Sequence, residues 1–504
     1  MTVWPGLVGP TYQLRSLNVD AERCMNLYPE AIGIADYYTA RIMGRDAGGS
    51  KTVFALYVTP GFTSAVTLSG PSVPGLFAQD GRAFAVSGST FYELTVSVTG
   101  TVSATSRGTL AQATQAFPVP TICSNGTGGN QLFITSGGYG YIYSLTANTL
   151  TLIADTAFPQ GAALVGGFTD SYFLVLVANS AKFQISAEED GTTWNVLGVP
   201  QVGQREDGSD LITSMVVDHR EVWLFGNATA EAWIDTGATF PFAPIQGSFS
   251  QVGTSSAFGP CALGGTVYFI GQSPRGERVA YALNASTPER VSTYAVEQVW
   301  STYATTADAQ SYAYEQGGHT FWVINFPSAN ATWVFDIATQ MWHQRGHWDA
   351  TMADYARQLP MSHCFAWGTT HLVGDRASGN VYALSLSTYA ENGAPLRWER
   401  QTVHLSTEQK RNVHHRLQVD LQVGQGLVTG QGSNPQVMLQ WSNDGGQTWS
   451  NEYWQSAGVI GAYNARVIWR RLGHARDRVY RVAGSDPVFT ALATAYLDVT
   501  PGLS

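Results

Sequence analysis

Charged residues are scarce in this sequence, and the charges present do not indicate nucleic-acid binding. Asp, Glu, Lys and Arg make up 13% of the 504 residues, about half the usual share, and the formal net charge is −10. A chain that is acidic overall is not expected to bind nucleic acid. Aromatic residues reach 12%. A surface with few charges and many aromatic side chains indicates that neighbouring subunits cover much of it.

Cysteine is rare and scattered. The four cysteines, Cys24, Cys123, Cys261 and Cys364, lie roughly a hundred residues apart without any paired spacing. This pattern argues against a disulfide framework and against a zinc site built from cysteine, and it fits folding in a reducing cytoplasm. We expect no cofactor and no metal.

Three kinds of segment are missing. The first residues lack the basic and apolar regions of a signal peptide, and no run of about 18 apolar residues predicts a membrane span. Long periodic runs of helix-forming residues are absent as well. The 53 Gly and 21 Pro are scattered, as expected for many tight turns. The composition therefore favours an all-β protein without membrane insertion.

An internal repeat is the clearest pattern that is present. Seven times, an apolar strand-like segment and a turn are followed by a second segment that often carries Tyr or Trp. The copies begin near residues 81, 130, 170, 219, 265, 318 and 369, so they lie 40 to 53 residues apart. Hairpins at this period are typical of four-stranded propeller blades, which stack into a ring to cover their faces. The sequence predicts a β-propeller of six or seven blades over residues 71–395, with a sandwich or solenoid of irregular hairpins as the alternative.

The residues outside the repeat predict a second domain. Residues 396–504 alternate between apolar and polar side chains, for example over 417–423 and 436–441, which indicates half-buried antiparallel strands. Residues 1–70 do not follow the repeat either. We predict a β-sandwich-like domain in residues 396–504, against which the N-terminal segment 1–70 packs.

One motif in the C-terminal domain matches the pattern called an Asp box. It consists of Ser442, Asp444, Gly446, Thr448 and Trp449, each at its expected position. The carboxylate is expected to accept backbone hydrogen bonds in a hairpin turn, the glycine to take a positive φ and the tryptophan to pack on the sheet. Asp190 to Trp194 is a partial echo. Asp boxes are common in sugar-active propellers, but we interpret this one as structural.

An enzyme or metal protein would need groups that converge, and the sequence does not predict such a set. A glycosidase requires paired carboxylates, and the acidic clusters at 188–190 and 206–207 fall in polar loops. Seven histidines between residues 343 and 415 lie near Cys364, but not at metal-ligand spacing. The loop 44–52 resembles a phosphate-binding loop without the required Gly-Lys pair. We predict a protein that is not an enzyme; a carbohydrate-binding or glycoside-cleaving propeller that acts on a host surface is the alternative.

Residues 469–482 are the most basic stretch. Its arginines include Arg470, Arg471, Arg476 and Arg478, which are the candidate residues for an assembly interface because Arg and Trp are common anchors there. Arg476 and Arg478 are expected on one face of a strand, since side chains alternate. Internal salt bridges with carboxylates such as Asp477 are the alternative interpretation.

An ordered set of segments resembles the tail-nozzle, or packaged-DNA stabilisation, family of podoviruses related to bacteriophage P22. The matching segments are residues 26–30, 59–62, 224–226 with 231–233, 240–242 with Gly247, 292–297, 332–336 with Trp342, the Asp box and 469–482. Together they extend over nearly the whole chain.

The resemblance implies a structural virion protein that resides in the phage tail and assembles in the host cytoplasm. It implies a hexameric ring of copies below a head-to-tail adaptor, with tail fibres or spikes docked outside. Double-stranded genomic DNA would pass through the ring without sequence recognition. The ring would close the DNA channel after packaging and open it for ejection.

Overall fold

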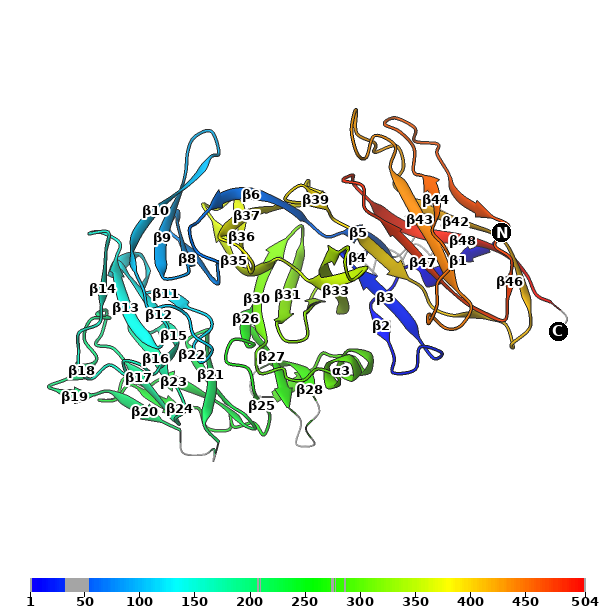
Figure 1. The fold of residues 1–504 in the computed structure, drawn as a ribbon. Coiled ribbons are helices and arrows are strands. Elements are labelled where there is room, and N and C mark those ends of the chain that lie inside the picture. The colour runs from blue at the N-terminus through cyan, green and yellow to red at the C-terminus, as the bar shows by residue number, and fades with distance from the viewer. Residues whose placement is uncertain are drawn as a thin grey trace, which may run out of the picture.

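The computed structural model describes residues 2–31, 54–205, 208, 210–272, 276, 278–284 and 287–502. The chain is all-β, with a propeller at one end and a sandwich at the other (Figure 1). The described residues contain three short helices, η1 (Pro5–Leu7), α2 (Gly126–Gly129) and α3 (Tyr294–Ser301). None of the described helices has the length and apolar character needed to cross a membrane.

The first four propeller blades are antiparallel sheets, each made of four strands in sequence order. Blade 1 contains β7 (Gly75–Gln79), β8 (Arg82–Ser87), β9 (Thr90–Val96) and β10 (Val102–Thr109). Blade 2 contains β11 (Thr121–Ser124), β12 (Gln131–Ser136), β13 (Tyr139–Ser144) and β14 (Thr149–Leu152). Blade 3 contains β15 (Ala163–Thr169), β16 (Tyr172–Val177), β17 (Lys182–Ile185) and β20 (Val202–Gln204), with the hairpin β18 (Asn195–Val196) and β19 (Val199–Pro200) inserted before β20. Blade 4 contains β21 (Ile212–Asp218), β22 (Glu221–Gly226), β23 (Ala230–Asp235) and β24 (Phe242–Pro244).

The last three blades are less regular. Blade 5 contains β25 (Gly253–Thr254), β26 (Cys261–Leu263), β27 (Thr266–Gln272), β28 (Arg278–Asn284) and β29 (Thr287–Arg290). Blade 6 contains β30 (Gln310–Gln316), β31 (His319–Phe326), β32 (Ala331–Asp336) and β33 (Met341–Asp349), beside which β34 (Asp354–Arg357) pairs. Blade 7 contains β35 (Pro360–Ala366), β36 (Thr370–Asp375), β37 (Asn380–Ser385) and β6 (Gly61–Thr67), followed by β38 (Ala390–Glu391) and β39 (Ala394–Pro395). The described residues thus form seven blades.

The ring closes between blade 7 and blade 1. The innermost strands contact one another in order around the axis, and β35 of blade 7 contacts β7 of blade 1. The fourth strand of blade 7 is β6, which pairs antiparallel with β37 from Gly61↔Ser385 to Thr67↔Asn380. The sequence assigned β6 to the N-terminal segment rather than to the propeller. The structure differs because β37 would otherwise leave its backbone groups unpaired at the edge of the blade.

The sequence repeat marks one particular turn of each blade. Its copies begin at or beside the turn between the first and second strands. In five blades this turn has two residues, both with positive φ, as in type I′ turns: Asp80-Gly81, Asp170-Ser171, His219-Arg220, Gly264-Gly265 and Gly317-Gly318. Such turns match the right-handed twist of the strands that they join. The repeat is therefore a repeat of hairpin geometry.

The sandwich is built from both ends of the chain. One sheet has the order β4 (Leu27–Ala31), β5 (Phe54–Val58), β48 (Ala491–Thr500), β42 (Asn412–Leu421) and β45 (Val467–Arg470), with β1 (Thr2–Trp4) on β48 and β46 (His474–Ala475) on β42. The other contains β3 (Ala21–Met25), β40 (Trp398–Gln401), β47 (Asp477–Gly484), β43 (Gln436–Ser442) and β44 (Tyr453–Ser456), with β2 (Tyr12–Gln13) on β3 and β41 (Leu405–Ser406) on β47. Their inner faces bury one core that includes Trp4, Leu56, Trp398, Leu417 and Trp469.

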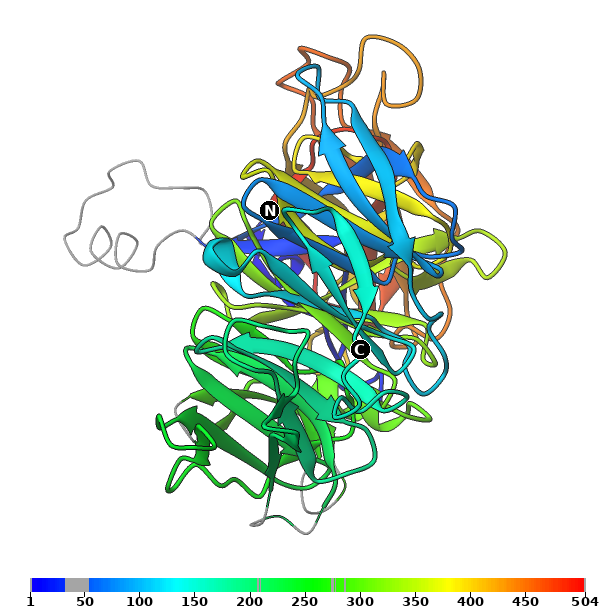
Figure 2. The same cartoon turned by 90° about the vertical axis from the view of Figure 1, so that its left-hand side faces the viewer.

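The two domains share a sheet. β3 bridges to β33 of blade 6 at Met25↔Gln344 and pairs with β40 of the sandwich on its other side. Figure 2 views the molecule from the propeller end, with the sandwich behind it. The backbone ladder therefore continues from one domain into the other at this bridge.

Candidate assembly surfaces

The Asp box folds as a hydrogen-bonded turn between β43 and β44. The carboxylate of Asp444 accepts bonds from the Ser442 hydroxyl (2.6 Å) and from the backbone N–H of Gln447 (3.0 Å) and Thr448 (2.9 Å). Gly446 has a φ of +97°, and Trp449 is half-buried beneath the guanidinium of Arg481, 3.7 Å from the ring centroid. No other carboxylate contacts Asp444 in the described part of the chain, and its bonds give it a structural role.

Asp444→Ala is expected to lower the free energy of unfolding by about 1 kcal/mol, because the turn loses its acceptor. The hydrogen bonds from Ser442 and Thr448 lower the pKa of Asp444 from 3.8 to about 2. The stabilisation is therefore complete above about pH 4 and is lost as the pH falls toward 2. Thermal melts of the variant and the parent at pH 7 and pH 2.5 test this, and an equal difference at both pH values would contradict it.

The partial echo in blade 3 is more deeply buried than the full Asp box. Asp190 accepts bonds from the N–H of Thr192 (2.9 Å) and the hydroxyl of Thr193 (2.9 Å). Trp194 is fully buried against Phe133 of blade 2 and Phe158 of the segment that joins blades 2 and 3. This loop therefore ties blade 3 to blade 2.

The structure corrects one of the four candidate interface arginines. Arg478 is 1% exposed and donates to the carbonyl oxygen of Leu472 (2.6 Å) and to the side chain of Asn443 (2.9 Å). Its guanidinium also lies over the ring of Trp441, 5.4 Å from the centroid. Backbone carbonyl groups satisfy this cation inside the sandwich, so Arg478 is not available to a partner.

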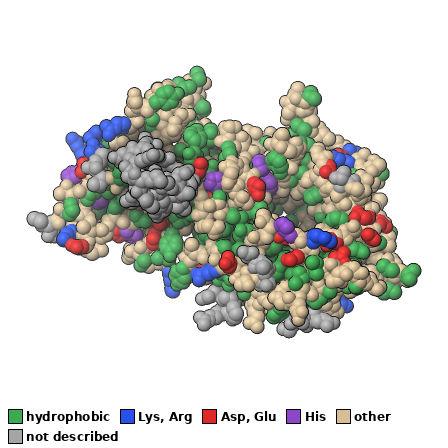
Figure 3. All heavy atoms as spheres, turned by 180° about the vertical axis from the view of Figure 1, so that it is seen from behind, with side chains coloured by type: hydrophobic (Ala, Val, Ile, Leu, Met, Phe, Trp, Pro, Cys, Tyr) green, Lys and Arg blue, Asp and Glu red, His purple; other side chains and the backbone are tan. Residues whose placement is uncertain are grey.

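The other three arginines lie at the surface. Arg470, Arg471 and Arg476 are exposed, and Arg476 donates to the carbonyl oxygen of Gln409 (2.8 Å). None of the three forms an ion pair with a carboxylate among the residues that the structure describes. Figure 3 shows Lys and Arg side chains gathered at the sandwich end of the molecule.

We call Arg416, Arg470, Arg471 and His474 the basic ridge. Two hollows flank it. One, of about 470 Å³, is lined by Arg470, Arg471 and His474 together with Tyr453 and Trp454. The other, of about 570 Å³, is lined by all four ridge residues with Val413 and Asp498 among others. A cationic ridge between two surface hollows can receive an acidic partner.

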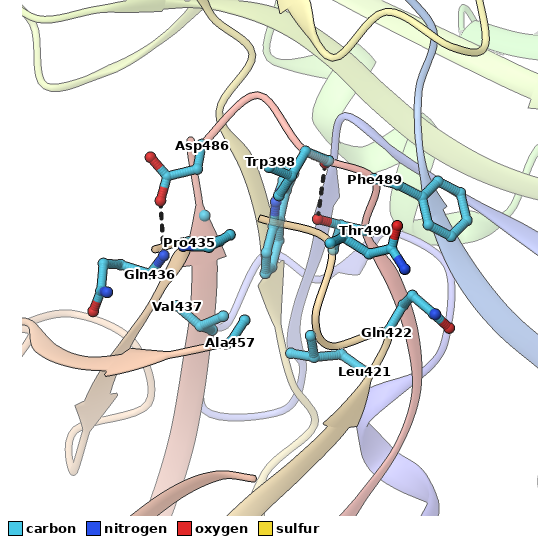
Figure 4. A pocket seen from close by; sticks show the side chains of 13 residues that line it. Trp398, Leu421, Gln422, Pro435, Gln436, Val437, Ala457, Asp486, Phe489 and Thr490 are labelled. Atoms are coloured by element: carbon cyan, nitrogen blue, oxygen red, sulfur yellow. Dashed lines mark hydrogen bonds between the residues drawn. The ribbon is translucent and has the colours of Figure 1, made fainter. Parts of the chain in front are cut away.

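The sandwich also contains a small internal cavity. The sandwich encloses a space of only about 20 Å³ beside Trp398, Val437 and Ala457, enough for about one water (Figure 4). Asp486 at its rim accepts a hydrogen bond from the N–H of Gln436 (2.7 Å). No group of three His, Cys, Asp or Glu residues among those described could hold a metal ion. The phosphate-loop-like segment 44–52 and residues 206–207 lie outside the described residues.

The clustered histidines have structural partners. His319 contacts Asp336 (2.9 Å), His347 contacts Glu391 (2.6 Å) and His404 contacts Asp477 (2.7 Å). His363 contacts His371 (3.1 Å) where blades 6 and 7 meet. Of these contacts, His347–Glu391 joins blade 6 to blade 7, whereas the other three lie within one blade or within the sandwich.

Acid is expected to destabilise the protein partly through His363. Burial, with a smaller contribution from His371, lowers the pKa of His363 from 6.5 to about 3. Below about pH 6.5 the unfolded chain therefore binds a proton at His363 that the folded chain does not bind. The free energy of unfolding falls as the pH falls through this range, and no such loss occurs above about pH 6.5. His363→Phe should reduce the loss of stability between pH 7 and pH 5 by roughly 1–2 kcal/mol. An unchanged pH dependence in denaturant titrations would refute this.

Two buried polar residues that sequence reasoning missed join the domains. Asn26 has a φ of +52° and bonds through its side chain to Gly346 of blade 6 and Arg397 of the sandwich. Arg400 donates to three carbonyl groups of the N-terminal segment and pairs with Glu22. Asn26 begins one of the segments on which the phage resemblance rests, but nothing local in the sequence shows its partners, hundreds of residues away.

Comparison with known families decides the relationship. A family model described as bacteriophage P22 Gp10, beta-propeller, matches residues 43–389, well over half of the chain. The chain belongs to the bacteriophage P22 Gp10 family. A second P22 Gp10 model, for the beta-sandwich, matches residues 397–500, so both domains are accounted for in order. The chain is a structural phage virion protein, and its architecture is the predicted β-propeller with a β-sandwich.

Other comparisons add little to the P22 Gp10 assignment. A search of curated proteins found no match. A chain of the S. cerevisiae Dbp5–Nup159–Gle1 complex is 8% identical, with a TM-score of 0.41 over 67% of this chain and 96% of its own. PorZ of Porphyromonas gingivalis is 10% identical, with a TM-score of 0.38 over 71% and 44%. The extracellular domain of BT4673 from B. thetaiotaomicron is 8% identical, with a TM-score of 0.43 over 84% and 58%. At these TM-scores none supports an inference about this chain.

Proposed function

We propose that this virion protein is a subunit of the tail nozzle of a podovirus. In this role copies of the chain form a hexameric ring below the head-to-tail adaptor, close the DNA channel after packaging and let DNA pass on ejection. Tail fibres or spikes dock outside the ring, and assembly takes place in the host cytoplasm. The observation that carries the proposal is that both P22 Gp10 models match, in order, along one chain.

The charge of the chain supports passage of DNA without sequence recognition. Residues 397–504 contain 11 Lys and Arg against 8 Asp and Glu, a formal charge of +3, which leaves −13 for residues 1–396. A channel wall formed by acidic surface repels the phosphate backbone, so DNA can slide past it. No observation favours the glycan-directed alternative.

The test is genetic complementation in a phage that lacks this gene. Particles without the protein should package DNA and then lose it, measured as genome that becomes sensitive to nuclease after packaging. Supplying the protein from a plasmid should restore retention and infectivity. Particles that keep their DNA and infect normally without the protein would refute the nozzle role.

A further inference from the structure

The two parts of this chain carry net charges of opposite sign. The C-terminal residues that form most of the sandwich are net positive, whereas the rest of the chain is strongly negative. In Figure 1 the sandwich strands β42 and β46 lie at one end and blade 3, with β17 and β18, at the other. The positive and negative parts therefore lie toward opposite ends of the folded molecule.

The positive end is the basic ridge, and its charges are not balanced within the chain. Arg416 and Arg470 stand directly opposite each other on neighbouring strands, an arrangement of like charges that destabilises a sheet. Asp498 lies 3.6 Å from Arg416, but Arg470 and Arg471 have no carboxylate partner among the described residues. Two adjacent unpaired guanidinium groups remain to bind an anion.

The backbone conformation of the basic ridge and the aromatic rings beside it favour a protein as its partner. Arg471 has a φ of +57°, which is unfavourable for arginine, and its N–H donates to the carbonyl oxygen of His415 (2.9 Å). Beside the ridge, Tyr453 and Trp454 are 47% and 54% exposed, and Tyr453 stacks on Trp441. Exposed Arg, Trp and Tyr together are the usual anchors of protein interfaces.

The negative end is the loop 187–193 of blade 3, which we call the acidic loop. Glu188 and Glu189 are exposed there, and neither forms an ion pair with another described residue. The loop is held in place, since the N–H of Glu189 donates to the carbonyl oxygen of Ser171 (2.7 Å) and its carbonyl accepts from Asn125 (3.3 Å). A fixed loop thus presents two adjacent carboxylates.

We propose that the basic ridge of one copy binds the acidic loop of a second copy, so that neighbouring subunits associate head to tail. Opposite charges at opposite ends favour this contact over a two-fold one, which would bring like charges together. A head-to-tail contact forms a ring when its rotation closes. The proposal rests on the proposed function only in that copies of the chain meet in a ring. A phosphate backbone is the less favoured partner, because most of the chain is acidic and repels DNA.

Two charge-reversed proteins test the contact. The first carries Arg470→Glu with Arg471→Glu, and the second carries Glu188→Arg with Glu189→Arg. Self-association of the purified full-length proteins is measured by light scattering after size exclusion and by native mass spectrometry. Each variant alone should dissociate with a constant raised about tenfold or more, because two attractions become repulsions. The parent association should weaken in high salt.

Mixing the variants is the decisive measurement. In an equimolar mixture, each reversed end can meet the oppositely reversed end of the other variant, so association should return to the parent level. Arg15→Glu with Lys182→Glu is the matched control for the Arg470→Glu, Arg471→Glu variant, since both residues are exposed and the net charge changes by the same amount in the same direction. This control should associate like the parent, and all variants should melt like the parent.

Several results would overturn the contact. These are a parent that stays monomeric, variants that associate like the parent, or a mixture that fails to recover. Binding of double-stranded DNA that only the Arg470→Glu, Arg471→Glu variant loses, with self-association intact, would assign the ridge to phosphate instead. Normal complementation together with any of these results would leave the nozzle role standing and reject only this contact.

Discussion

Asn26→Ala is expected to lower the free energy of unfolding by about 4 kcal/mol. The amide of Asn26 donates to the carbonyl oxygens of Gly346 (2.8 Å) and Arg397 (2.7 Å), and its oxygen accepts from the N–H of Gly346 (2.9 Å). Without the side chain, three backbone groups, two in buried bonds and one in a part-buried bond, lose their partner, at about 1–3 kcal/mol each before any water enters. The positive φ adds roughly 1 kcal/mol for alanine.

Denaturant titration followed by tryptophan fluorescence measures this effect. Asn179→Ala is the matched control, because Asn179 also has a positive φ (+54°) but is exposed and makes no side-chain hydrogen bond with a described residue. The control should lose about 1 kcal/mol at most. Asn26→Gly separates the effect of the lost hydrogen bonds from the effect of the positive φ, because glycine adopts a positive φ without strain but makes no side-chain hydrogen bond. Equal losses for Asn26→Ala and Asn179→Ala would show that Asn26 does not join the domains.

Arg400→Met is expected to cost about 3–5 kcal/mol and to release the N-terminal segment from the sandwich. The guanidinium of Arg400 is fully buried and donates to the carbonyl oxygens of Leu7 (2.7 Å) and Pro10 (2.8 Å). It also pairs with Glu22, a carboxylate that the variant would leave without its cation. Denaturant unfolding and limited proteolysis of residues 2–23 are the measurements.

A double substitution tests the electrostatic part of this prediction. Arg400→Met combined with Glu22→Gln removes the unpaired charge and should recover part of the loss. Lys410→Met is the control, because the Lys410–Glu408 ion pair is exposed and contributes less than about 1 kcal/mol. If Arg400→Met melts like Lys410→Met and its N-terminal segment resists protease, the hydrogen bonds and ion pair of Arg400 do not hold that segment against the sandwich.

The candidate surfaces show which site properties sequence can reveal. The sequence identifies the Asp box, because the turn forms within eight residues and its acceptor and its glycine have local roles. It also identifies the basic stretch. It does not distinguish Arg478 from Arg470, because alternation predicts which side chains share a face but not what covers that face. In the structure, Leu472 and Asn443 cover Arg478, while Arg470 faces solvent.

By itself the sequence determined the all-β class, the propeller and the sandwich. Short-range patterns specify these features: the period of the hairpins, the turns such as Gly317-Gly318 and the alternation in the C-terminal strands. Only the tertiary structure decided that β6 closes blade 7, that Asn26 joins blade 6 to the sandwich and that Arg400 holds the N-terminal segment. These contacts join residues more than 300 positions apart. They form because folding leaves a strand edge or a buried polar group that must be paired, and local sequence does not name the partner.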